Sequence, residues 1–254
     1  MKTVILAGGL GTRLSEYTNK IPKPMVHVYK IPILFHIIAI YQKNGLDDFV
    51  IAAGYKFEYI QKIFCQYATK IKKNKNAVQI DFYYSCNLFD IKCKVKIVNT
   101  GLNTMTGGRI KKILRYIDTE NFCLTYGDGV SNVDIKKLIV FHLKHKKIAT
   151  LTAVRPPVRF GELILKKESV IDFQEKPKLA RGWINGGFFV LNKKIMNYID
   201  DNKTMLERKP LEKLAAIKEL KAFKHEGFWQ CMDSKRDKDL LEEMCSVKNM
   251  PWLK

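Results

Sequence analysis

Two hydrophobic patterns alternate along the first 155 residues of the chain. Short, continuous apolar runs are typical of buried strands, and apolar residues that recur every three or four positions are typical of helices packed on a sheet. Strands and helices that alternate in this way predict an α/β fold with a doubly wound, mostly parallel, Rossmann-like sheet. The expected strands are 4–6, 48–53, 78–84, 94–98, 122–126 and 148–154. The expected helices are 32–44, 56–67, 134–144 and one that includes Arg109 in its first turn and has its apolar face at 110–117.

The pattern changes after residue 156, where the expected strands become shorter and lie closer together. Short strands at close spacing indicate a smaller, mixed or antiparallel region. No linker, repeat or low-complexity segment separates it from the first part, so we expect one domain over residues 1–254, with a core to about residue 155 and the smaller region from about 156. Its expected strands are 162–165, 169–174, 183–191 and 220–225, and its expected helices are 193–199, 210–217 and 234–244.

A glycine-dense turn follows the first expected strand, at residues 8–11. Without Cβ atoms in the way, backbone N–H groups of such a turn can approach a ligand closely. Arg13 adds a fixed fork of donors that suits phosphate oxygens, and Lys23 lies between two prolines that stiffen the backbone around it. The spacing is neither a dinucleotide fingerprint nor a P-loop. The combination predicts a polyphosphate site, and the alternative is a turn that merely ends a strand.

A carboxylate and an arginine follow later strands. Asp128 lies between two glycines directly after the strand 122–126, and the carboxyl ends of strands are where open α/β sheets bind ligands. A carboxylate there suits Mg²⁺, although an ordinary turn aspartate is the simpler interpretation of the spacing. Arg109 falls in the first turn of a helix, where the helix N-terminus favours an anion.

Several motifs together resemble the sugar-phosphate nucleotidylyltransferases, which make nucleotide sugars from a nucleoside triphosphate and a sugar 1-phosphate. The resemblance begins with the glycine loop followed by P-K-P-M and extends in order over nearly the whole chain. The later matching segments are T-G-L-N-T-M-T-G-G-R (100–109), G-D-G-V (127–130), Q-E-K-P-K (174–178), N-G-G-F-F-V-L-N (185–192) and F-W-Q-C-M-D-S (228–234).

Within that family, R-L-S-E (13–16), P-P-V-R-F-G (156–161) and G-F-W-Q-C-M-D (227–233) resemble the cytidylyltransferase branch. The resemblance implies CTP as donor, Mg²⁺ as cofactor held by Asp128 and Asp233, a nucleotide-binding core and an acceptor-binding second region. The catalytic residues that it implies are Arg13, Lys23, Asp128, Lys176 and Asp233. The CTP-binding residues are Leu6, Ala7, Gly8, Gly9, Leu10, Gly11, Thr12, Arg13, Lys23, Thr104, Arg109 and Asp128, and the acceptor-binding residues are Gly161, Glu162, Glu175, Lys176, Asn185 and Gly186.

The implied reaction is attack of an acceptor phosphate oxygen on the α-phosphorus of CTP, with release of pyrophosphate. Both reactants are polyanions, so the protein must chiefly align them and neutralise their charge, and an ionised phosphate needs no general base. Glucose 1-phosphate is the expected acceptor, which would give CDP-glucose.

Two departures from the branch leave the acceptor open. The connection 86–96 is short, and Glu162 stands where a small residue is usual. A carboxylate at that place would pair with the ammonium group of an amino-acid phosphate, such as phosphoglutamine, or of an amino-sugar phosphate. The alternative is a solvated Glu162. A non-catalytic regulatory homologue is a further alternative, but the presence of all five catalytic residues argues against it.

Composition adds mainly exclusions. The net charge of +20 comes from lysines spread through every segment, which match no nucleic-acid module, so no nucleic-acid partner is expected. No apolar run is long enough to span a bilayer and no signal peptide is evident, so we expect a cytoplasmic protein without a membrane partner. Six scattered cysteines form no C-x-x-C pair, and no zinc site is expected. The five histidines are expected to pack in the core or to contact solvent. The protein is expected to be a homo-oligomer.

Overall fold

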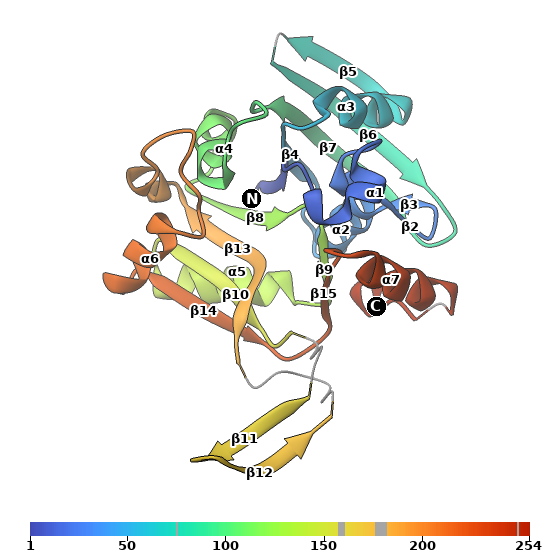
Figure 1. The fold of residues 1–254 in the computed structure, drawn as a ribbon. Coiled ribbons are helices and arrows are strands. Elements are labelled where there is room, and N and C mark those ends of the chain that lie inside the picture. The colour runs from blue at the N-terminus through green and yellow to red at the C-terminus, as the bar shows by residue number, and fades with distance from the viewer. Residues whose placement is uncertain (75, 157–160, 176–181, 248) are drawn as a thin grey trace.

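A nine-stranded sheet forms the centre of the molecule in the computed structural model, which describes residues 1–74, 76–156, 161–175, 182–247 and 249–254 (Figure 1). The strand order is β14-β10-β13-β8-β1-β4-β7-β6-β5. In chain order these strands are β1 (Thr3–Ala7), β4 (Asp48–Ala53), β5 (Ala68–Asn74), β6 (Ala77–Ser85), β7 (Asp90–Asn99), β8 (Asn121–Tyr126), β10 (Ala149–Val154), β13 (Ile184–Asn192) and β14 (Leu220–His225).

The four central strands β8, β1, β4 and β7 run parallel, and antiparallel pairs extend the sheet on both sides. From β1 the chain adds β4 on one side and later β8 on the other side. The carboxyl ends of β1 and β8 therefore meet at the point where the direction of winding reverses, which is where open α/β sheets bind ligands.

Helices cover both faces of the sheet (Figure 1). Alternate residues of β1 belong to two separate hydrophobic cores, Ile5 to the core under α2, α3, α5 and α7, and Val4 to the core under α4 and α6. Such burial on both faces explains why the strand is a continuous apolar run. The helices are α1 (Ser15–Thr18), α2 (Ile33–Lys43), α3 (Phe57–Gln66), α4 (Thr106–Ile113), α5 (Ile135–His145), α6 (Lys209–Ala216) and α7 (Lys235–Ser246).

Short elements complete the fold. The 3-10 helices are η1 (Thr12–Leu14), η2 (Lys23–Met25), η3 (Leu114–Tyr116), η4 (Lys193–Tyr198) and η5 (Pro251–Leu253). Three small antiparallel ladders pair β2 (His27–Val28) with β3 (Ile31–Pro32), β9 (Gly129–Ser131) with β15 (Trp229–Cys231), and β11 (Glu162–Lys166) with β12 (Ser169–Gln174). No helix of the described residues is long and apolar enough to cross a membrane.

The architecture confirms the predicted doubly wound α/β fold, with a smaller antiparallel part at the β11–β12 hairpin that projects from the body (Figure 1). Strands β13 and β14 join the same sheet as the first half, and Leu241 of α7 and Trp252 of η5 lie in the same core as α2. Residues on both sides of position 155 therefore share one sheet and one core.

Two local expectations were wrong. Strand β5 was not expected, and β7 begins at Asp90, four residues before the expected strand 94–98. Nearly every side chain of β5 is exposed, including Ile71, because it is an edge strand with almost no buried face. Its sequence therefore shows no alternation of apolar and polar residues. Pairing with β6 forms the strand, and its lysines discourage pairing with a further strand.

Candidate active site

A cavity of about 350 Å³ opens at the carboxyl ends of β1 and β8, where the direction of winding reverses. Ten of the twelve residues expected to bind CTP line it, whereas Ala7 is buried in the core and Leu10 is exposed. The lining residues are Leu6, Gly8, Gly9, Gly11, Thr12, Arg13, Lys23, Pro24, Thr104, Met105, Thr106, Arg109, Tyr126, Gly127 and Asp128.

The glycine loop owes its path to two close contacts. Gly11 has a φ of 67°, in the left-handed region that glycine adopts without strain, and a Cβ there would lie 2.8 Å from the side chain of Thr18. A Cβ on Gly8 would collide with the guanidinium of Arg109. Glycine at both positions therefore lets the loop pack tightly against the residues that support it.

Arg109 supports the loops that follow three neighbouring parallel strands. Its Nη2 donates to the carbonyl of Gly8 at 2.8 Å, and its Nη1 donates to the carbonyls of Ala53 at 3.2 Å and Gly101 at 3.0 Å. These carbonyls lie at the carboxyl ends of β1, β4 and β7. The side chain is 4% exposed, and burial lowers the pKa of Arg109 to about 10. Direct binding of CTP by Arg109 stays a prediction, and the observed contacts are those of a group that positions the glycine loop.

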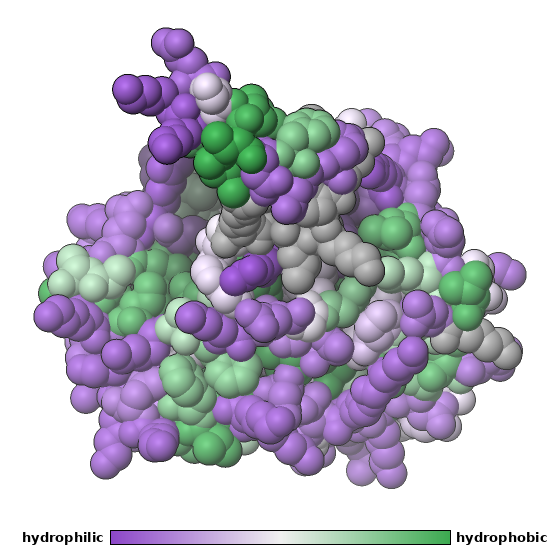
Figure 2. Space-filling model, turned by 90° about the horizontal axis from the view of Figure 1, so that it is seen from below, coloured by the Kyte–Doolittle hydropathy of each residue, from purple (hydrophilic) through white to green (hydrophobic). Residues whose placement is uncertain are grey.

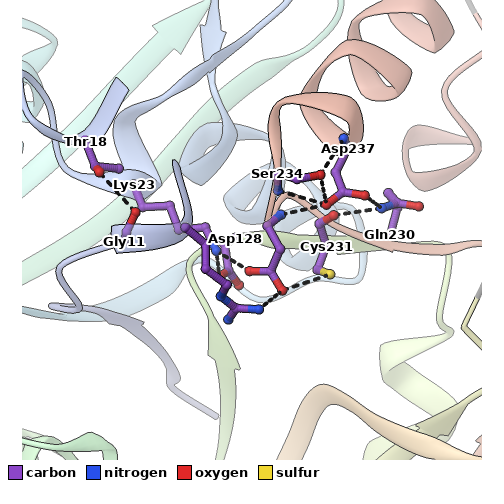
Figure 3. Close-up of polar contacts among 10 residues, drawn as sticks. Gly11, Thr18, Lys23, Asp128, Gln230, Cys231, Ser234 and Asp237 are labelled. Carbon is purple, nitrogen blue, oxygen red and sulfur yellow. Dashed lines mark hydrogen bonds and ion pairs between the residues drawn. The ribbon is translucent and has the colours of Figure 1, made fainter. Parts of the chain in front are cut away.

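Two carboxylates and two cationic side chains form a cluster beside this loop (Figure 3). Nζ of Lys23 lies 2.6 Å from Oδ2 of Asp128 and 2.6 Å from Oδ1 of Asp233. Nη1 of Arg13 donates to the other oxygen of Asp233 at 2.7 Å. The fold thus brings together four of the five residues expected to be catalytic, and Lys176 lies outside the described residues.

Charge and burial act in opposite directions in this cluster. Burial disfavours the charged form of Lys23, but the ion pairs and hydrogen bonds with Asp128 and Asp233 outweigh it, so the pKa of Lys23 is raised. Burial likewise acts to raise the pKa of Asp233, and Lys23 and Arg13 reverse that effect and lower it. Both side chains are therefore charged at neutral pH, and each stabilises the charge of the other.

The turn that presents Asp233 is anchored at the start of α7 (Figure 3). Ser234 is the N-cap of this helix and forms a capping box with Asp237, whose Oδ2 also accepts from the backbone N–H of Asp233 at 3.1 Å. The backbone N–H of Met232 donates to the carbonyl of Asp128 at 2.8 Å, next to the β9–β15 pairing. Strand pairing and a helix cap thus bring the two carboxylates to one place.

The two carboxylates suit a hard divalent cation such as Mg²⁺. One oxygen of each already lies against a single positive charge, so both are directed at the same point. Within the described part of the chain, no group of three or more histidine, cysteine, aspartate or glutamate side chains is arranged to hold a metal ion. A site with two protein carboxylates is what Mg²⁺ commonly uses when substrate phosphates and water supply its other ligands.

Sequence reasoning missed a second polar network, which includes Tyr126 and Thr106 of the cavity lining. The hydroxyl of Tyr126 donates to Oε1 of Glu207 at 2.7 Å, and the hydroxyl of Thr106 donates to Oε2 of Glu207 at 2.6 Å. Burial and the neighbouring Glu207 charge raise the pKa of Tyr126 far above its usual value, so the phenol stays protonated. Glu207 lies 101 residues from Thr106 in the chain, in a segment without a recognisable motif, so no local signal identified it.

The expected acceptor residues lie in two places. Asn185 donates from Nδ2 to the hydroxyl of Tyr126 at 3.3 Å, and Tyr126 lines the cavity. The carbonyl of the next residue, Gly186, accepts from Nε1 of Trp229 at 2.7 Å. Gly161 and Glu175 lie close together at the base of the β11–β12 hairpin. The side chain of Glu162 and all of Arg159, Phe160 and Lys176 lie outside the described residues.

A doubly wound sheet with carboxylates and cations gathered at its switch point is the architecture of an enzyme that handles nucleotide phosphates. Comparison with known proteins makes this specific: the chain belongs to the nucleotidyl transferase family, whose model matches residues 2–234. It is a nucleotidyltransferase of the kind used in nucleotide-sugar biosynthesis.

Individual relatives cover almost the whole chain. Glucose-1-phosphate cytidylyltransferase of Salmonella typhimurium is 47% identical over 99% of this chain and 98% of its own length. A probable glucose-1-phosphate cytidylyltransferase of Bacillus subtilis is 39% identical over 99% of both chains. Among solved structures, HddC from Yersinia pseudotuberculosis superposes with a TM-score of 0.70 at 27% identity, over 96% of this chain and 99% of that one. The same protein has been solved in complex with GMP-PN, with a TM-score of 0.69 at 26% identity and the same coverage.

Proposed function

We propose that this protein transfers CMP from CTP to glucose 1-phosphate and so forms CDP-glucose and pyrophosphate. The observation that carries the proposal is the convergence of Asp128, Asp233, Lys23 and Arg13 beside the glycine loop, in a chain 47% identical over 99% of its length to a glucose-1-phosphate cytidylyltransferase. A phosphate oxygen of the acceptor attacks the α-phosphorus, the bond from that phosphorus to the bridging oxygen of the β-phosphate breaks, and pyrophosphate leaves with the electron pair.

Each member of the cluster has a role in this reaction. Asp128 and Asp233 would hold Mg²⁺, which supplies positive charge to the phosphates when bound. Arg13 and the backbone of the glycine loop bind the β- and γ-phosphates and stabilise pyrophosphate as it departs. Lys23 neutralises charge on the donor phosphates, and Lys176 does so on the acceptor phosphate. No residue needs to remove a proton, because the attacking phosphate is ionised at neutral pH.

Two further side chains position parts of the cavity wall. Arg109 holds the glycine loop through its bonds to three backbone carbonyls, and Glu207 fixes Tyr126 and Thr106 in the cavity lining. A cavity whose lining is already in place favours the reaction, because alignment of two polyanionic substrates is a large part of catalysis here.

We also infer that the protein is a homo-oligomer in which a second copy covers the β11–β12 hairpin. Apolar side chains gather on this hairpin, which faces the viewer in Figure 2, and their exposed fractions are about half or more. They are Leu163, Leu165, Val170, Ile171 and Phe173, at 50%, 58%, 54%, 59% and 60% exposed. Light scattering on wild type and a Leu165→Ser, Phe173→Ser variant tests this, and a monomeric wild type contradicts it. The cytoplasmic location expected from the sequence stays a prediction.

An acceptor panel tests the reaction itself. Purified protein with CTP and Mg²⁺ is given glucose 1-phosphate, glucosamine 1-phosphate or phosphoglutamine, and pyrophosphate release and product mass are followed. We expect glucose 1-phosphate to be the best acceptor and CDP-glucose to be the product. Preference for an amino-bearing acceptor would contradict the proposed acceptor and would implicate Glu162, and absence of turnover with every acceptor would contradict the enzymatic assignment.

A further inference from the structure

We propose that, in the protein without nucleotide, the ammonium of Lys23 occupies the position of the metal ion between Asp128 and Asp233. A divalent metal that binds these carboxylates must therefore displace it. The inference rests on the proposed function only in assigning a metal to these carboxylates. It adds that the metal binds weakly until nucleotide phosphates are present to pair with the displaced ammonium of Lys23.

The contacts of Lys23 are those of a bound cation. Its Nζ lies 2.6 Å from one oxygen of each carboxylate, and these two carboxylates come from turns 105 residues apart in the chain. Short charge-assisted bonds of this kind are about twice as strong as bonds between neutral groups. Any metal that binds the same two oxygens must therefore compete with an existing strong partner.

The backbone of Lys23 is buried and closely packed, so displacement of the ammonium by a metal requires movement of the end of the side chain. Residues Lys23, Pro24 and Met25 form the buried 3-10 helix η2, which Pro22 precedes. A Cβ on Gly11 would lie 3.0 Å from Cβ of Lys23, which shows how closely the glycine loop packs on the lysine stem. The stem is fixed beneath the loop, and its ammonium lies on the border of the cavity expected to hold the nucleotide.

The charges of the cluster explain why the exchange needs nucleotide. Asp128 and Asp233 carry two negative charges, and Lys23 and Arg13 carry two positive charges, so the four side chains balance. A divalent ion that takes the same two oxygens without nucleotide would leave the ammonium of Lys23, whose side chain is 10% exposed, without a partner, which is unfavourable. A nucleoside triphosphate supplies oxygens for the displaced ammonium, since Lys23 lines the cavity expected to hold the nucleotide.

Removal of the lysine charge should therefore tighten metal binding in the absence of nucleotide, which is opposite to the loss expected if Lys23 merely supports the site. Lys23→Met removes the competing ammonium and keeps most of the volume of the stem. We expect its Mn²⁺ affinity to rise about ten- to hundredfold, the range that corresponds to a hydrogen bond between charged groups. Lys23→Gln removes the charge but keeps a hydrogen-bonding group, and its affinity should also rise at least about tenfold.

The experiment measures Mn²⁺ binding to nucleotide-free protein by calorimetry, with electron paramagnetic resonance of free Mn²⁺ as a second readout. Lys238→Met is the matched control, because Lys238 is equally buried at 9% exposed against 8% but pairs with Glu242 at 2.7 Å and not with the carboxylate pair. The double variant Lys23→Met, Asp233→Asn should lose the gain. If Lys23→Met is less stable because its carboxylates repel one another, Mn²⁺ should raise its Tm more than it raises that of wild type.

Unchanged or weaker Mn²⁺ binding by both Lys23 variants would overturn the proposal, and so would an equal gain in Lys238→Met. These measurements use neither CTP nor an acceptor. A protein that binds Mn²⁺ as expected but releases no pyrophosphate would contradict the proposed reaction and leave the lysine exchange standing, whereas an active enzyme without the Mn²⁺ gain would do the reverse.

Discussion

The ammonium of Lys23 and the carboxylate of Asp233 meet at 2.6 Å although they lie 210 residues apart in the chain. Lys23 follows the first strand of the sheet, and Asp233 precedes the last helix, α7. Leu241 and Cys245 of α7 lie in the same core as α2. The site is thus complete only when the C-terminal helix has docked, and truncation of α7 would remove the support of one carboxylate.

Asp128→Asn and Asp233→Asn should each lower kcat by about 100-fold or more with the fold retained, because charge stabilisation by a metal contributes several kcal/mol to the transition state. Pyrophosphate release at saturating CTP and Mg²⁺ gives kcat, and circular dichroism checks the fold. The control is Asp239→Asn, which neutralises an exposed aspartate of α7. Near-normal kcat in either variant would remove that carboxylate from the proposed metal site.

Arg13→Ala should raise the KM for CTP, and Lys176→Ala should raise the KM for the acceptor. Arg13 lines the cavity proposed to hold CTP, whereas Lys176 belongs to the segment that resembles the acceptor-phosphate motif of the family. Initial rates over a grid of both substrate concentrations separate the two effects. Equal donor and acceptor defects in the two variants would show that the division of roles is wrong.

Arg109→Lys should weaken both the fold and the binding of CTP, although the positive charge is kept. A lysine cannot reproduce a planar fork that donates to Gly8, Ala53 and Gly101 at once, so the links that hold these three loops together are partly lost. We expect a loss of about 2 kcal/mol or more in the free energy of unfolding. Urea denaturation measures it, with the exposed Arg115→Lys as control, and equal stability of the two variants would contradict the positioning role.

Two buried histidines should make the fold sensitive to acid. His36 lies between the carbonyl of Val28 and Nε1 of Trp252, and His142 lies between Thr150 and Asn121. Burial lowers the pKa of each to about 4, against about 6.5 in an unfolded chain. The unfolded state therefore binds protons first as pH falls, so stability is full above about pH 6.5 and falls progressively down to about pH 4.

The histidine contribution is checked by urea unfolding at several pH values between 7 and 4. Each histidine should account for a loss of at most about 3 kcal/mol across this range. His142→Gln should be less stable than wild type at pH 7 but should show a shallower decline towards pH 4. An unchanged slope in His142→Gln would contradict the assignment.

Local patterns predicted most of the fold. Strands 48–53, 169–174 and 220–225 were expected with the bounds that the structure has, because apolar or alternating runs there end at glycine or polar residues. Strand β5 was missed because its lysine-rich edge position supplies no buried face, and only its ladder with β6 defines it.

The site was predictable to a smaller extent. The glycine loop, Arg13 and Lys23 could be reasoned from residue chemistry, and Asp233 entered only through resemblance to a family. Its meeting with Asp128 depends on the pairing of β9 with β15, two strands of three residues each, which are too short to show an alternating strand pattern. Glu207 was missed for the same reason, since its partners Thr106 and Tyr126 are brought to it by the fold alone.

The most direct test of the proposed function is the kcat/KM for CTP against UTP, dTTP, GTP and ATP, with glucose 1-phosphate as acceptor and Mg²⁺ present. A pocket with polar groups arranged for one base should reject the others by a large factor, and we expect CTP to be preferred by about 100-fold or more. Mass spectrometry should identify the product as CDP-glucose. Comparable kcat/KM values for two or more nucleotides, or pyrophosphate release with every nucleotide except CTP, would contradict the account.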